Sequence, residues 1–69
     1  MSGEITVNGE ATALTAGNVV ELLRAKGVDP AARGVAVAVN GAVVPRRDWA
    51  ERRLDAGDAV EIVKPFAGG

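Results

Sequence analysis

Two Asn-Gly dipeptides, Asn8-Gly9 and Asn40-Gly41, restrict the fold of this chain more than any other feature of its sequence. A two-residue hairpin turn of type I′ needs a positive φ at both central residues, and Asn-Gly meets this need with little strain. Short, mostly apolar stretches lie on either side of each dipeptide, which is the pattern of paired strands. The chain is therefore expected to form two β-hairpins.

Four strands are expected around these turns. In the first hairpin, Ile5-Thr6-Val7 alternates apolar and polar residues, which predicts a strand with one buried face, and residues 10–14 return antiparallel to it. In the second, residues 35–39 are Val-Ala-Val-Ala-Val, so the three valines share one face of the strand and the two alanines share the other. Residues 42–44 return, and Pro45 ends this strand because proline has no N–H to donate.

Between the hairpins, residues 18–26 have the pattern of one short amphipathic helix. Asn18 is placed to cap its N-terminus, with Glu21 at the third helical position as in a capping box. Gly27 is placed to end the helix in a left-handed conformation. The apolar stripe, at positions i, i+3 and i+4, consists of Val19, Leu22 and Leu23. A helix this short depends on packing that stripe onto a sheet.

The rest of the chain completes one sheet. Residues 46–54 are polar and helix-permissive, with Trp49 as an expected anchor, and residues 59–64 alternate as a last strand before Pro65. The order ββαββ-(short helical turn)-β predicts an α+β fold, a mixed sheet of four to five strands packed on one main helix. With the first and last strands parallel at its centre, this is the β-grasp, or ubiquitin-like, arrangement. We assign residues 1–64 to this domain and residues 65–69 to a flexible tail that ends in Gly-Gly.

Composition argues against several classes of function. At 69 residues the chain has room for one small domain and none for a buried active-site cleft. It lacks Cys and His, which removes the thiol nucleophile, the usual general base and the commonest zinc ligands, so we expect no enzyme and no metal site. A formal net charge of −1 argues against nucleic-acid binding. The longest apolar stretch, residues 35–39, is too short to span a membrane. Residues 1–4 lack the basic and apolar pattern of a signal peptide, so the expected compartment is the cytoplasm.

Two charged clusters have both a functional and a structural interpretation. Asp55 and Asp58 flank Gly57 and could hold a metal, but their spacing matches no calcium loop, and a turn with side-chain-to-backbone hydrogen bonds is favoured. Four arginines surround Trp49 and could bind phosphate or nucleic acid. Acidic residues are interleaved with them, which favours a solvated helical turn over a buried Trp49. The four arginines are Arg46, Arg47, Arg52 and Arg53.

The outer face of the sheet, turned away from the helix, is a candidate docking surface for another protein. Strand alternation places four residues there, Ala36, Ala38, Glu61 and Val63. A flat patch of small and apolar side chains that nothing else in so short a chain can cover is typical of such a surface. The alternative is a set of scattered alanines without a function.

The last residues, Gly68-Gly69, give the strongest functional signal. Pro65 ends the strand, and five residues in extended conformation reach at most about 16–18 Å. A tail without Cβ atoms at its tip can enter a channel that any side chain would block. Its terminal carboxylate is ionised at neutral pH and unhindered. Because the chain lacks side-chain catalysts, another enzyme would have to activate this carboxylate.

These residues resemble those of a known family, the ThiS sulfur carriers of thiamine biosynthesis, which are small ubiquitin-like β-grasp proteins. The most specific stretch begins at Val39-Asn40-Gly41, continues through Val44-Pro45-Arg46 and reaches Trp49-Ala50. Gly57-Asp58 extends the similarity, and Ala67-Gly68-Gly69 matches the family terminus. The resemblance covers essentially the whole chain.

The resemblance implies a carrier mechanism centred on Gly69. An adenylyltransferase of the ThiF type, related to ubiquitin-activating enzymes, would adenylate the Gly69 carboxylate with ATP and magnesium. A donor such as a cysteine desulfurase persulfide would supply sulfur to form a thiocarboxylate. A thiazole synthase of the ThiG type would then take that sulfur. In this scheme Phe66, Ala67 and Gly68 thread into the partner, and the chain itself binds no cofactor.

Three alternatives remain open at this point. The chain could be the small subunit of molybdopterin synthase, which shares the fold, the terminus and the thiocarboxylate. It could be another thiocarboxylate carrier, as in cysteine biosynthesis, or a protein modifier. From a different class, it could be a non-catalytic β-grasp module that binds protein or RNA and has no need of a free Gly-Gly end.

Overall fold

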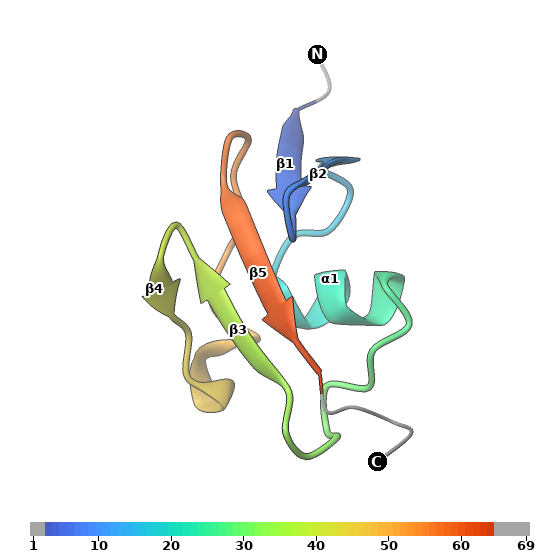
Figure 1. Cartoon of the computed structure of the whole chain (residues 1–69), viewed down its shortest axis with the longest axis vertical. Coiled ribbons are helices and arrows are strands. Elements are labelled where there is room, and N and C mark those ends of the chain that lie inside the picture. The colour runs from blue at the N-terminus through green and yellow to red at the C-terminus, as the bar shows by residue number, and fades with distance from the viewer. Residues whose placement is uncertain (1–2, 65–69) are drawn as a thin grey trace.

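The computed structural model describes residues 3–64 of the chain, and within them the elements follow the expected order (Figure 1). The first hairpin consists of β1 (Glu4–Val7) and β2 (Glu10–Ala13), and α1 (Val19–Ala25) follows it. The second hairpin consists of β3 (Ala36–Val39) and β4 (Ala42–Val43). A 3₁₀ turn, η1 (Arg46–Asp48), then leads to β5 (Ala59–Val63). The predicted tail, residues 65–69, lies outside the described residues.

The sheet is mixed and has β5 at its centre. The strand order is β2-β1-β5-β3-β4. Strand β1 runs parallel to β5, with Thr6 opposite Ala59 and Val7 opposite Val60, and the other neighbours are antiparallel. The parallel pair needs a crossover connection, and α1 lies within the chain segment that joins the two strands. The predicted pairing of the first and last strands is confirmed, and with it the ubiquitin-like β-grasp arrangement.

Both Asn-Gly turns have the predicted geometry. The φ angles of Asn8 and Asn40 are 53° and 54°, and those of Gly9 and Gly41 are 85° and 83°. Positive φ at both central residues is the condition for a type I′ turn. The two hairpins therefore form as the dipeptides predicted.

Helix α1 is capped at both ends by its own sequence. Asn18 Oδ1 accepts a hydrogen bond from Glu21 N at 2.8 Å, as expected of an N-cap. The Glu21 carboxylate accepts from Gly17 N instead of from the cap residue, which is a small departure from the capping box. At the other end Gly27 has φ 76°, and Val28 N donates to Leu23 O at 2.8 Å. This Schellman motif turns Val28 back into the core.

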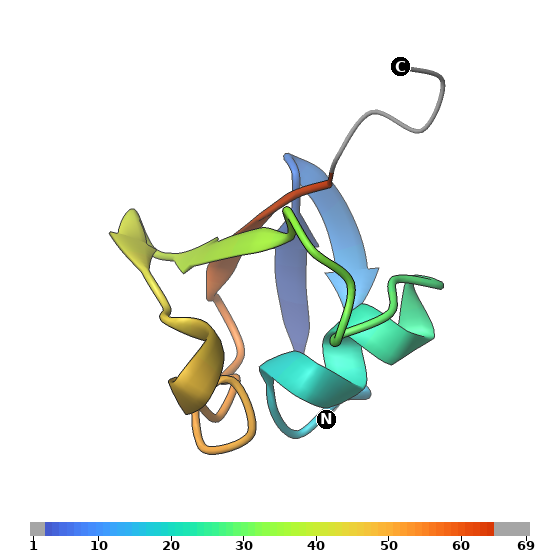
Figure 2. The same cartoon turned by 90° about the horizontal axis from the view of Figure 1, so that it is seen from below.

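The helix and the 3₁₀ turn cover the same face of the sheet, and among the described residues no helix lies on the other face (Figure 2). The predicted inner positions of the strands are buried, as is the predicted helix stripe. Together they form one apolar core, which includes Ile5, Val7, Val19, Leu22, Leu23, Val37, Val39, Leu54, Val60 and Ile62. Burial of these side chains supplies the main free energy of folding.

Trp49 anchors the segment between the second hairpin and β5. Its side chain is 2% exposed, and its indole Nε1 donates to Val44 O at 2.8 Å. The Arg46 guanidinium lies 4.6 Å from the centre of the Trp49 ring and donates to Pro30 O and Ala32 O. The expected buried Trp49 is confirmed. Arg46 was expected to be solvated, but its hydrogen bonds connect η1 to the loop before β3.

The turn at Asp55 and Asp58 is a structural junction. Asp58 is 8% exposed, and its carboxylate accepts hydrogen bonds from Asp55 N at 2.9 Å and Asn40 Nδ2 at 3.0 Å. Arg52 lies 3.9 Å from the same carboxylate. The pKa of Asp58 is lowered, and the hydrogen bond from the Asp55 backbone is the largest cause. Burial acts in the opposite direction and raises the pKa, while the contacts with Asn40 and Arg52 lower it further. The predicted turn is confirmed, and Asp58 also joins it to the second hairpin.

This pKa shift predicts a stability that depends on pH. Because the pKa of Asp58 is lower in the folded chain than in the unfolded chain, its stabilisation is complete well above the ordinary value of about 3.9 and is lost as the pH falls below it. We expect Asp58→Asn to lower the free energy of unfolding by about 1–2 kcal/mol at pH 7 and by less at pH 3. Urea denaturation at the two pH values measures this difference.

The control is Asp55→Asn, because the Asp55 side chain is exposed and only its backbone N–H contacts Asp58. This variant should follow the wild-type dependence on pH. A constant gap between wild type and Asp58→Asn from pH 7 to pH 3 would contradict the assignment.

Candidate functional site

The described end of β5 is the point from which the predicted tail starts, and it is held from both sides. Strand β3 pairs with residues 60–63 of β5, and β1 pairs with its first two residues, Ala59 and Val60. Beyond the β1 ladder, Asn8 Oδ1 accepts from Ile62 N at 2.8 Å and Asn8 Nδ2 donates to Ile62 O at 3.2 Å. The Asn8 side-chain amide thus bonds to both polar backbone atoms of Ile62, as the backbone of a neighbouring strand would. Ile62 is therefore fixed only three residues before Pro65.

The predicted sulfur-carrying residue, Gly69, lies outside the described residues, as do Phe66, Ala67 and Gly68. Their roles stay predictions. The described residues define the body from which the tail extends, and this body has two hollows close to the end of β5.

The first hollow lies on the outer face of the sheet and contains the predicted docking residues. Ala36 is directly opposite Val63, and Ala38 is directly opposite Glu61, in the antiparallel β3–β5 pair. All four side chains therefore lie on one face, as the alternation predicted. They line a shallow apolar hollow of about 140 Å³. We call these four residues, together with Val43, the outer patch.

Val43 is the member of this patch that the sequence interpretation missed. It is 76% exposed, and Val63 is 61% exposed, which is unusual for large apolar side chains. The signal was present, because a two-residue turn at Asn40-Gly41 sets the register that places Val43 opposite Ala38. Residues opposite each other in a pair share a face of the sheet.

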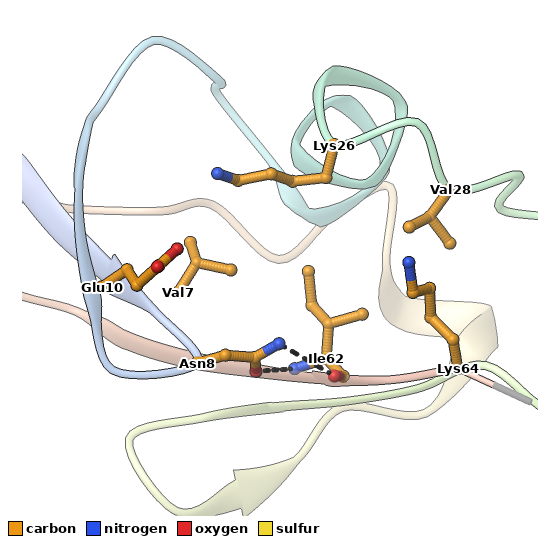
Figure 3. A pocket seen from close by; sticks show the side chains of 7 residues that line it. All are labelled: Val7, Asn8, Glu10, Lys26, Val28, Ile62 and Lys64. Carbon is orange, nitrogen blue, oxygen red and sulfur yellow. Dashed lines mark hydrogen bonds between the residues drawn. The ribbon is translucent and has the colours of Figure 1, made fainter. Parts of the chain in front are cut away.

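The second hollow lies on the helix side of the sheet and was not predicted. It measures about 180 Å³, between β1, the end of α1 and the end of β5. Figure 3 shows its lining side chains, with the Lys26 and Lys64 chains extending toward the space and Asn8 below it. We call it the lysine hollow. Its lining residues are Val7, Asn8, Glu10, Lys26, Val28, Ile62 and Lys64.

Residues 3–64 bring together no group of three or more acidic, His or Cys side chains that could hold a metal ion. Within the same range no helix has the length and apolarity that crossing a membrane requires. Of the four arginines near Trp49, Arg46 and Arg52 make intramolecular contacts, while Arg47 and Arg53 are exposed.

A mixed five-stranded sheet with one helix on a single face, and a central last strand that leads to the C-terminal residues, defines a ubiquitin-like β-grasp protein. The model of the ThiS family matches residues 4–69 of the chain. The sulfur carrier protein ThiS of Escherichia coli (strain K12) is 33% identical over 66 residues, which are 96% of this chain and 98% of that protein. The chain belongs to the ThiS family.

Solved structures agree with this assignment. The crystal structure of the thiamine biosynthesis protein ThiS from Geobacter metallireducens has a TM-score of 0.76 and 36% identity, over 96% of this chain and 99% of that one. The solution structure of a thiamine biosynthesis protein from the same organism also has a TM-score of 0.76 and 36% identity, over 96% and 87% of the two chains. The resemblance drawn from the sequence is confirmed at the level of family and fold.

Two substitutions of Asn8 separate the contribution of its side-chain hydrogen bonds to stability from that of its positive φ. Asn8→Gly keeps the positive φ but loses both hydrogen bonds to Ile62, so the free energy of unfolding should fall by about 1–2 kcal/mol. Asn8→Ala also strains the turn and should cost about 1 kcal/mol more. Urea denaturation measures both. If Asn8→Gly were as stable as wild type, the side chain would not hold β5.

Proposed function

We propose that this protein is a sulfur carrier of thiamine biosynthesis and that it carries sulfur as a thiocarboxylate on Gly69. The observation that carries the proposal is the family match, which runs from residue 4 to Gly69 itself. The sulfur carrier protein ThiS of Escherichia coli matches over nearly the whole length of both chains. The family match includes the residue on which the proposed chemistry depends.

The proposed chemistry takes place on a backbone carboxylate. An adenylyltransferase of the ThiF type joins the Gly69 carboxylate to AMP, using ATP and magnesium and releasing pyrophosphate. This step converts an unreactive anion into an electrophile with a good leaving group. The outer sulfur of a donor such as a cysteine desulfurase persulfide attacks the acyl adenylate and displaces AMP, which forms an acyl disulfide. A thiol then reduces this disulfide, leaving the thiocarboxylate on Gly69 and a disulfide on the donor side. A thiazole synthase of the ThiG type then takes the sulfur.

The composition of the chain supports this division of labour. With no Cys and no His in the sequence, the chain offers neither a side-chain thiol for sulfur nor the usual general base. The catalytic groups therefore belong to the partners. Gly68 and Gly69 present no Cβ to a narrow active site, so the tail of residues 65–69 is suited to reach the catalytic groups.

We assign the outer patch to docking of the activating enzyme. Val63 is exposed on β5 only two residues before Pro65, so an enzyme bound there is placed to receive the tail. The patch is apolar apart from Glu61, and burying exposed Val43 and Val63 would contribute about 25 cal/mol per Å². The matching surface of the enzyme is therefore expected to be apolar.

The central prediction concerns Gly69. Incubation with the adenylating enzyme, ATP, magnesium and a sulfur source should raise the intact mass by the exchange of one oxygen for one sulfur. Deleting Gly69 should abolish this gain, because the acyl group then lies one residue short of the reacting centre. The full-length variant Glu51→Gln, changed at an exposed position, is the control and should react as wild type does. Sulfur uptake by the deletion variant would overturn the proposal.

A second prediction concerns the outer patch. Ala36→Lys should raise the KM for the carrier in the adenylation reaction about tenfold and leave kcat unchanged, because it places a charge in an apolar contact. Ala11→Lys is the matched control, since Ala11 is also an exposed strand alanine but lies on the distant edge strand β2. Equal effects of the two substitutions would rule out docking at the patch.

A further inference from the structure

The lysine hollow combines an apolar base with a charged rim. Val7, Val28 and Ile62 line its interior, and all three belong to the core. The rim includes the side chains of Lys26, Lys64 and Glu10 (Figure 3). Asn8 also lines the hollow and is held by its hydrogen bonds to Ile62. The rim therefore has a net positive charge.

The fold positions each cation independently. Lys26 is the C-cap residue of α1, and the left-handed Gly27 after it turns the chain so that Val28 enters the hollow. Lys64 follows the alternation of Val60 and Ile62 along β5, which puts its side chain on the helix side of the sheet. Among residues 3–64 the ion pair observed joins Arg52 and Asp58, so Glu10 is not within ion-pair distance of either lysine.

The size of the hollow limits what it can hold. Pockets that bind cofactors or drug-sized ligands measure about 300–1,000 Å³, so a hollow of about 180 Å³ is too small for a nucleotide. It has room for one protein side chain. A carboxylate on a short methylene stem fits its chemistry, because the stem contacts the apolar base and the oxygens accept charge-assisted hydrogen bonds from the two ammonium groups.

The position of the hollow identifies the protein that would supply this side chain. Lys64 is the last described residue and directly precedes Pro65, where the predicted tail begins. An enzyme that takes the tail into its active site must surround this point. The lysine hollow lies on one side of β5 and the outer patch on the other, so an enzyme that contacts both would hold the base of the tail from two sides.

We propose that the lysine hollow receives an acidic side chain, Asp or Glu, of the enzyme that activates Gly69. This inference rests on the proposed function. It adds an electrostatic contact to the apolar one at the outer patch, and charge complementarity at such a contact sets the orientation and register of docking. The two contacts together fix the direction in which the tail enters the enzyme.

The test uses the full chain with the adenylating enzyme, ATP and magnesium, and measures kcat and KM for the carrier from pyrophosphate release. The double variant Lys26→Glu/Lys64→Glu should raise KM roughly tenfold or more at low salt, with kcat unchanged, and added salt should reduce the difference. Lys26→Arg/Lys64→Arg keeps both charges and should behave almost as wild type does. Lys26→Gln/Lys64→Gln should give a smaller rise in KM. It is used in place of Lys26→Glu/Lys64→Glu if that variant does not fold.

The matched control is Arg47→Glu/Arg53→Glu, which changes the net charge equally at exposed positions away from the hollow. An equal rise in KM for this control would show that overall charge governs the encounter and would overturn the inference. So would a change confined to kcat, or a wild-type KM in the Lys26→Glu/Lys64→Glu variant. If wild type itself is not adenylated, the proposed function fails, which separates the two failures.

Discussion

The pairing of β5 with both hairpins is the interaction on which the rest of the structure depends. Each hairpin contributes a strand to one side of β5, and each also contributes the side chain of its turn asparagine. Asn40 Oδ1 accepts from Ala59 N at the start of β5, and Asn8 bonds both polar backbone atoms of Ile62 near its end. These amides satisfy backbone groups that would otherwise lose their partners where the neighbouring strands stop. The last strand is thus fixed along its length by segments distant in sequence.

This arrangement suits a protein whose proposed chemistry takes place beyond its last strand. A rigid β5 gives the tail a defined origin, and the two faces beside it offer contacts of different character. The outer patch is apolar and flat, with Ala36 opposite Val63, while the lysine hollow is small and positively charged at its rim. Apolar burial contributes binding free energy, and complementary charge contributes orientation. Under the proposed function both contacts are used, because the terminus has to enter the enzyme in one direction.

Much of this fold could be predicted because its signals are local. The Asn-Gly turns require positive φ, the Asn18 cap and Gly27 delimit the helix, and the Val-Ala alternation assigns both faces of β3. The shared outer face of the proposed docking residues followed from the same alternation. Val43 was missed although the turn fixes its register, because the return strand was interpreted without pairing it to Ala38. The lysine hollow could not be predicted, since Lys26 and Lys64 are distant in sequence and line one hollow only when α1 packs on the sheet.

The sequence by itself determined the order of the elements, the inner and outer faces of the strands, and the resemblance to the ThiS family. The first two depend on backbone preferences and side-chain periods that act over a few residues, and the resemblance depends on matching residues along the chain. Only the tertiary structure decided that Asn8 and Asn40 form hydrogen bonds with β5 and that the buried Asp58 bonds to the second hairpin. The same is true of the two lysines that line one hollow. Each of these contacts joins residues far apart along the chain. Their geometry exists only after the sheet has closed around its central strand.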